Sequence, residues 1–158
     1  MKKLILAAAL VSGLGVNAWM AQAASTSGTF NVNITLNSTC SLSAITALDF
    51  TYTSFGSAAT ATGGGFTVTC TNSLPYTFGL LAGTGGSGAG TSTITVTDNA
   101  VNLQYTVGTD TAGGTGNGAA QSHSVTGTMA AGQSGTCVSA SCPNTSATNK
   151  TQTLVLTF

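Results

Sequence analysis

The sequence predicts an all-β fold, an antiparallel β-sandwich. Apolar and polar residues alternate along several short segments, which is the pattern of strands that bury one face. Glycine, serine and threonine fill the stretches between these segments, as is typical of turns and loops. No window combines the 3.6-residue period with the capping residues of a sizeable helix. About seven short strands separated by turns are typical of a single-domain sandwich.

The first 23 residues predict a secretory signal peptide. Lys2 and Lys3 give a positive start, an apolar run follows at 4–16, and Ala21-Gln22-Ala23 matches an A-x-A cleavage site. The apolar run is too short to span a bilayer, and we expect no membrane span later in the chain. We therefore expect an exported mature chain that begins near Ala24 and forms one domain.

The clearest strand pattern opens this mature chain, between Gly28 and Asn37. Threonine and asparagine alternate there with the apolar residues Phe30, Val32, Ile34 and Leu36. Because side chains of a strand point to opposite faces in turn, the segment would carry one continuous apolar face.

The other expected strands follow in order along the chain. They lie at 40–42, 48–52, 66–70, 75–80, 94–96, 101–107, 122–129 and 153–158. Connections rich in small residues separate them at 57–65, 83–90, 108–120 and 132–149. In the weak strand at 122–129 we expect Val125 and Met129 to point inward. The last strand ends on Phe158, so no further strand follows it.

Charge is scarce in the expected mature chain. Beyond residue 23 the only ionic residues are Lys150 and three aspartates, Asp49, Asp98 and Asp110, which gives a formal charge of −2. A chain with so little positive charge lacks the basic surface that binds nucleic acid or anionic lipid. We therefore expect no nucleic-acid partner, and we expect uncharged polar residues on the solvent faces.

Four cysteines follow the leader: Cys40, Cys70, Cys137 and Cys142. In an exported chain they are expected to form disulfides, and four cysteines allow three pairings. We favour Cys40–Cys70, which joins the first strands, and Cys137–Cys142, which closes a small loop. A metal site built from these thiols and His123 fits less well because the paired CxxC spacing is absent.

Three features resemble catalytic or nucleotide-binding motifs, and each has a simpler interpretation. Gly83–Gly88 matches G-x-G-x-x-G, but a strand is predicted after it, where a dinucleotide site requires a helix. His123 lies between two serines without a nucleophile turn, so we interpret it as a surface histidine on a strand. The aspartates are scattered, and Asp98 beside Asn99 is typical of a turn. We therefore expect no enzyme, no cofactor and no metal.

The strand order and several short motifs together resemble the spore coat protein U family, which includes pilin subunits of archaic chaperone–usher pili. The motifs are Cys40, Leu48-Asp49-Phe50, Val68-Thr69-Cys70-Thr71, Pro75-Tyr76, Leu103-Gln104-Tyr105 and the terminal strand ending in Phe158. Thr51 stands where the family usually has glycine, and the pair Cys137–Cys142 is an addition.

The resemblance implies an incomplete immunoglobulin-like antiparallel β-sandwich at 38–158, which lacks its last strand and leaves an apolar groove. An N-terminal donor strand at 24–37 of another subunit would fill the groove with Phe30, Val32, Ile34 and Leu36. The strand bordering the groove, which a chaperone would bind, would present Leu154, Leu156 and Phe158. The implied partners are like or related pilin subunits, a periplasmic chaperone and an outer-membrane usher.

Our leading hypothesis is a structural subunit of a surface pilus, exported through the periplasm and joined by donor-strand complementation. Two alternatives stay open: a secreted coat protein that layers on a spore or cell surface, and an adhesin for a sugar or an abiotic surface. A third possibility is that the opening strand folds back into its own groove.

Overall fold

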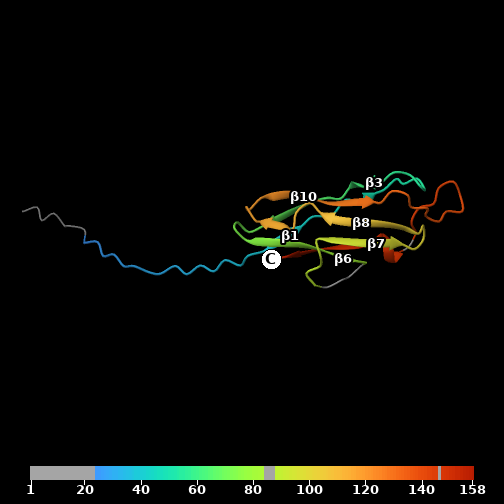
Figure 1. The fold of residues 1–158 in the computed structure, drawn as a ribbon. Coiled ribbons are helices and arrows are strands. Elements are labelled where there is room, and N and C mark those ends of the chain that lie inside the picture. The colour runs from blue at the N-terminus through green and yellow to red at the C-terminus, as the bar shows by residue number, and fades with distance from the viewer. Residues whose placement is uncertain (1–23, 84–87, 146) are drawn as a thin grey trace, which may run out of the picture. The chain divides into compact units, whose positions relative to one another are not determined.

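The computed structural model describes residues 24–83, 88–145 and 147–158 (Figure 1). The predicted signal peptide at 1–23 lies outside the described residues, as does most of the glycine motif. The chain divides into two units, Met1–Thr35 and Leu36–Phe158. The β-sandwich is formed within the second unit.

The described part of the first unit, 24–35, contains no strand. The four alternating apolar side chains at 30, 32, 34 and 36 are between 69% and 86% exposed. The strand predicted at Gly28–Asn37 is therefore absent from the single chain. A strand forms only where its backbone N–H and C=O groups have a hydrogen-bonded neighbour, and apolar alternation alone does not supply one. The use of this segment as a donor strand stays a prediction.

The described part of the second unit contains eleven short strands and one helical turn. Their bounds are β1 (Cys40–Leu42), β2 (Leu48–Asp49), β3 (Ala59–Thr60), β4 (Thr62–Gly63), β5 (Gly65–Cys70), β6 (Pro75–Ala82), β7 (Thr93–Asp98), β8 (Leu103–Thr109), β9 (Gly113–Thr115), β10 (Ala120–Met129), α1 (Ala147–Lys150) and β11 (Gln152–Thr157).

The longer predicted strands are confirmed, with shifts of a few residues at their ends. The strand expected at 48–52 is shorter, since only Leu48–Asp49 pairs with β4. The strand expected from 101 begins at Leu103, because Asn102 has a left-handed φ of 49° in the preceding turn. β3, β4 and β9 lie in segments predicted as loops. Each has only two or three residues and is held by a neighbouring strand, so its sequence shows no periodicity.

The strands form two main antiparallel sheets (Figure 1). One sheet has the order β1-β5-β10-β8-β7, with β3 also pairing with β10. The other has the order β11-β6-β9, and β2 and β4 form a small separate pair. This is the antiparallel, immunoglobulin-like sandwich that the sequence predicted.

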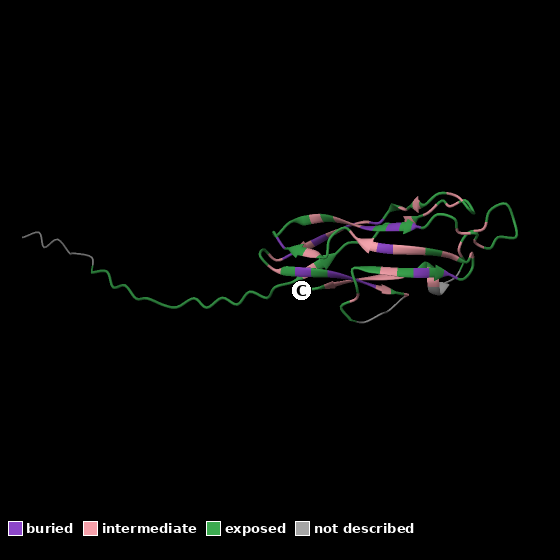
Figure 2. Ribbon diagram, viewed as in Figure 1, coloured by how far each residue is buried: buried purple, intermediate pink, exposed green. Residues whose placement is uncertain are grey.

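The core lies between β5 of one sheet and β6 of the other. Alternate residues of both strands are buried (Figure 2), and Phe66 of β5 meets Phe78 of β6 edge to face with ring centroids 5.3 Å apart. Val107 of β8 and Val125 of β10 complete this cluster. The core therefore holds the two sheets together through a few large side chains from their central strands.

Both favoured disulfides are confirmed. Cys40 and Cys70 are directly opposite each other in the β1–β5 pair, and Cys70 is part of the buried core. Cys137 and Cys142 close an exposed loop between β10 and α1. The first disulfide therefore fixes the start of the sandwich, whereas the second constrains only a local loop.

Candidate functional site

β11 is an edge strand of its sheet. It pairs with β6 along its whole length, from Gln152 opposite Ala82 to Thr157 opposite Thr77. Among the described residues, no strand pairs with its other side. Its outward backbone groups are therefore available to another strand.

A cavity of about 800 Å³ opens into the sandwich beside the first half of β11. The segment 45–52, which contains β2, lines one side, and 150–154 lines the other. The core residues Leu80, Val107 and Val125 also line it. We call this cavity the β11 groove. It gives access to the core at the place where β11 lacks a neighbour.

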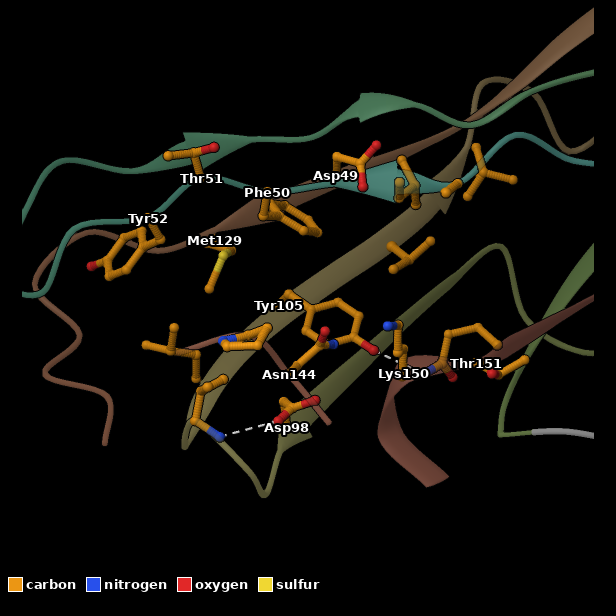
Figure 3. Close-up of a pocket in the computed structure, with 18 of the residues that line it drawn as sticks. Asp49, Phe50, Thr51, Tyr52, Asp98, Tyr105, Met129, Asn144, Lys150 and Thr151 are labelled. Carbon is orange, nitrogen blue, oxygen red and sulfur yellow. Dashed lines mark hydrogen bonds between the residues drawn. The ribbon is translucent and has the colours of Figure 1, made fainter. Parts of the chain in front are cut away.

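About half of the groove wall is apolar. Leu48, Phe50, Tyr105, Met129 and Leu154 line it, and the rings of Phe50 and Tyr105 lie with centroids 5.8 Å apart. Figure 3 shows Phe50, Met129 and Tyr105 around the same space. A surface of this kind suits an extended apolar segment, whose alternate side chains would point into it.

The three residues predicted for the bordering strand take different positions. Leu154 lines the groove, and both Leu154 and Leu156 are partly buried against the core. Phe158 follows the end of β11 and is 58% exposed. The structure therefore brings Leu154 and Leu156 to the core side of an edge strand and leaves the C-terminal residue accessible.

One end of the groove is polar, and no pattern in the sequence predicted it. Its polar lining residues are Asp98, Tyr105, Asn144, Lys150 and Gln152 (Figure 3). Tyr105 donates a hydrogen bond to the Asn149 carbonyl and accepts one of 2.8 Å from Gln152 Nε2. Because these residues come from four separate segments, no local sequence pattern marks the cluster.

A family model for the Spore Coat Protein U domain matches residues 26–155. The chain belongs to this family. The match covers the exposed N-terminal segment and nearly all of the sandwich, and it confirms the resemblance stated from the sequence. The Spore Coat Protein U domain is a structural, pilin-type domain rather than an enzyme family. The comparisons with curated proteins and with solved structures found no match.

The histidine of this Spore Coat Protein U domain takes part in packing. His123 lies on β10, as predicted, but its side chain is only 10% exposed, so the prediction of a surface residue was wrong. Its Nε2 lies 2.8 Å from the Tyr76 hydroxyl, and its Nδ1 lies 3.4 Å from an Asp110 oxygen. Burial, and then the charge of Asp110, raise the pKa of Tyr76. Val125 and Met129 share the strand phase of His123, and this shared phase could have predicted its burial.

In the described part of the domain, no group of three or more potential ligands among His, Cys, Asp and Glu lies close enough together to hold a metal ion. No described helix has the length and apolar character needed to cross a bilayer.

Alkaline pH is expected to destabilise the domain through Tyr105. Burial raises the pKa of Tyr105 above 10.0; the hydrogen bond from Gln152 lowers it, and the charge of Asp98 raises it further. The unfolded chain then releases this proton at lower pH than the folded chain, so stability is complete below about pH 10 and falls as pH rises further. Urea unfolding between about pH 8 and 11 measures how the free energy of unfolding changes with pH. Tyr105→Phe should reduce this dependence and leave the part due to Tyr76, whose pKa is also raised. An equal dependence in both chains would contradict this assignment.

Proposed function

We propose that the chain is a structural subunit of a chaperone–usher surface fibre, and that subunits join when the segment 24–37 of one copy enters the β11 groove of another. The observation that carries this proposal is the groove itself, where an edge strand with a free side borders a cavity that reaches core residues. An added strand would pair with β11 through backbone hydrogen bonds and would fill the cavity with alternate side chains.

The N-terminal segment has the composition that such a groove requires. Its four alternating apolar side chains are exposed in the single chain. Burying them would stabilise the complex by about 6–12 kcal/mol, while association costs about 4–15 kcal/mol. Backbone hydrogen bonds along β11 are therefore needed for a lasting joint.

The ends of the sandwich favour a linear assembly. Cys40, at the start of β1, is opposite Cys70, the last residue of β5. A short turn leads from Cys70 to the start of β6. There, Thr77 of β6 is opposite Thr157 at the end of β11. β1 therefore begins at the end of the sandwich where β11 finishes. The first half of β11, beside the groove, lies toward the other end. Insertion from copy to copy is a head-to-tail contact that does not close on itself, so it would build a filament.

A subunit whose groove is empty needs a partner that covers the groove before assembly. Exposed core and a free strand edge together favour aggregation. A periplasmic chaperone that lends a strand to the groove would prevent it, and an outer-membrane usher would exchange that strand for the next subunit.

A coat on a spore or cell surface is the second candidate, and the description of the matched family favours it. The two functions differ in the assembly that the subunits form. A fibre needs a chaperone and an usher and consists of linked subunits, whereas a coat would form from purified monomers that adsorb to cells.

Removal of residues 24–36 tests the proposed function. The full mature chain, produced with its chaperone and usher, should give a ladder of SDS-resistant species that collapses to monomer on boiling. The truncated chain should give monomer only, at every protein concentration. Ladders of equal length from both chains would contradict strand insertion. A full chain that stays monomeric on concentration, with its N-terminal segment protected from proteolysis, would indicate insertion into its own groove instead.

A further inference from the structure

We propose that the carboxylate of Asp98 determines which segments the groove accepts, by accepting a hydrogen bond from the Ser38 hydroxyl of the inserted chain. This inference rests on the proposed function and names a polar recognition point within the same groove. The occupant is a second copy of this chain.

Asp98 has an unused hydrogen-bonding position in a buried place. The residue is 2% exposed, and it lines the groove. Its Oδ1 accepts hydrogen bonds from the backbone N–H groups of Ala100 (2.9 Å) and Val101 (3.2 Å). Its Oδ2 has no hydrogen-bond partner among the residues that the structure describes. A buried carboxylate oxygen without a donor destabilises a fold, so a donor supplied by a ligand would be favoured there.

Two of the neighbouring polar groups of the groove are already engaged with other partners. The Tyr105 hydroxyl donates to the Asn149 carbonyl, and the Gln152 amide N–H groups bond the Tyr105 hydroxyl and the Asn149 carbonyl. Asp98 stands at the end of β7, opposite Leu103 of β8, next to the start of β11. The open position therefore lies where an inserted strand would reach the beginning of β11.

The direction of insertion decides which end of the segment reaches Asp98. In a head-to-tail assembly, opposite ends of two sandwiches meet. The donor contributes the end where its β1 begins, and the acceptor contributes the end where its β11 begins. The inserted segment then runs antiparallel to β11, with its C-terminal residues beside Gln152.

The period and the length of the inserted strand identify Ser38 as the residue that reaches Asp98. The residues from Phe30 to Leu36 span about 20 Å at ~3.4 Å per residue, which is close to the length of β11. The next position that points inward is two residues further, at Ser38. It falls just beyond Gln152, at the polar end of the groove. Its hydroxyl is a small donor of the kind that Asp98 Oδ2 lacks.

The rate at which polymers of the full mature chain dissociate tests this assignment. Unboiled gels sampled over time in SDS at fixed temperature give the rate for Ser38→Ala, Asp98→Asn and the double variant. Loss of the hydrogen bond should make dissociation about tenfold faster in Ser38→Ala. Asp98→Asn should have a smaller effect, because its amide N–H can still donate to the Ser38 hydroxyl. The double variant should dissociate no faster than Ser38→Ala, because that change already removes the contact.

Two matched controls accompany these variants. Ser27→Ala removes a hydroxyl from the outward phase of the same segment. Asp110→Asn removes the charge of another turn-capping aspartate, whose Oδ1 accepts a hydrogen bond of 2.9 Å from Thr111 N–H and which does not line the groove. Both should match the unsubstituted rate. Ser38→Thr keeps the hydroxyl and should also match it, so the assignment is tested even if Asp98→Asn fails to fold.

The possible outcomes separate this inference from the proposed function. If polymers form but Ser38→Ala dissociates no faster than Ser27→Ala, the Asp98–Ser38 contact is wrong and strand insertion stands. Additive effects in the double variant would also overturn the contact. If the unsubstituted chain forms no polymers with its chaperone and usher, the proposed function fails and this inference fails with it.

Discussion

Replacement of Ile34 by aspartate is expected to abolish polymer formation while leaving the sandwich folded. Ile34 is the third of the four apolar side chains predicted to enter the groove, and it is exposed in the single chain. The change removes its burial energy and places a carboxylate against an apolar wall. Together these effects cost at least about 5 kcal/mol, a loss of more than about a thousandfold in affinity. Unboiled gel electrophoresis should show monomer only.

Asn33→Asp is the matched control for this variant. It adds the same charge one residue earlier, in the phase that points away from the groove. It should polymerise like the unsubstituted chain, because a charge that stays in solvent has little effect. Equal loss of polymers in both variants would mean that charge, rather than the apolar phase, controls assembly. Equal retention would mean that Ile34 does not enter a groove.

Replacement of Cys40 and Cys70 by serine is expected to cause the largest loss of stability in the domain itself. The disulfide closes a loop with a sequence separation of 30, and the chain-entropy estimate for this closure is about 3–4 kcal/mol. Cys70 is also part of the buried core, where serine would place a hydroxyl. The melting temperature should fall by roughly 10–20 °C, as measured by thermal unfolding.

The second disulfide supplies the comparison. Cys137 and Cys142 have a sequence separation of 5, and the same estimate gives about 2 kcal/mol for closing this loop. Both cysteines lie outside the core cluster, so their replacement by serine adds no comparable burial cost. The melting temperature should fall by clearly less than in the Cys40 and Cys70 variant. An equal fall in both variants would contradict the central role assigned to the disulfide between β1 and β5.

The sequence predicted the parts of this fold that depend on local patterns. Alternation identified β5, β6, β8 and β11. β5 and β6 bury alternate residues in the core, whereas Leu154 and Leu156 of β11 pack against it only partly buried. The cysteine pairing followed from the same local view, since Cys40 and Cys70 each lie in a predicted strand. Alternation was misleading at Gly28–Asn37, where the apolar pattern has no paired edge in the single chain.

The polar end of the groove could not be predicted in the same way. Asp98 was correctly interpreted as a turn residue, since its Oδ1 holds two backbone N–H groups of the turn. Its other oxygen is buried, and the groove beside Asp98 is lined by Tyr105, Gln152 and the segments 45–52 and 141–144, which are far apart in sequence. Only the packing of these segments creates the site, and no spacing of residues encodes it.

Lys150 has a consequence for the durability of the proposed fibre. Residues 24–158 contain this one lysine and no arginine, so a trypsin-like protease has one candidate cleavage site per subunit, after the last residue of α1. That peptide bond joins α1 to the exposed Thr151, immediately before β11. A strand held against β11 would shelter the bond, and digestion of the fibre would then have to begin at a subunit whose groove is empty.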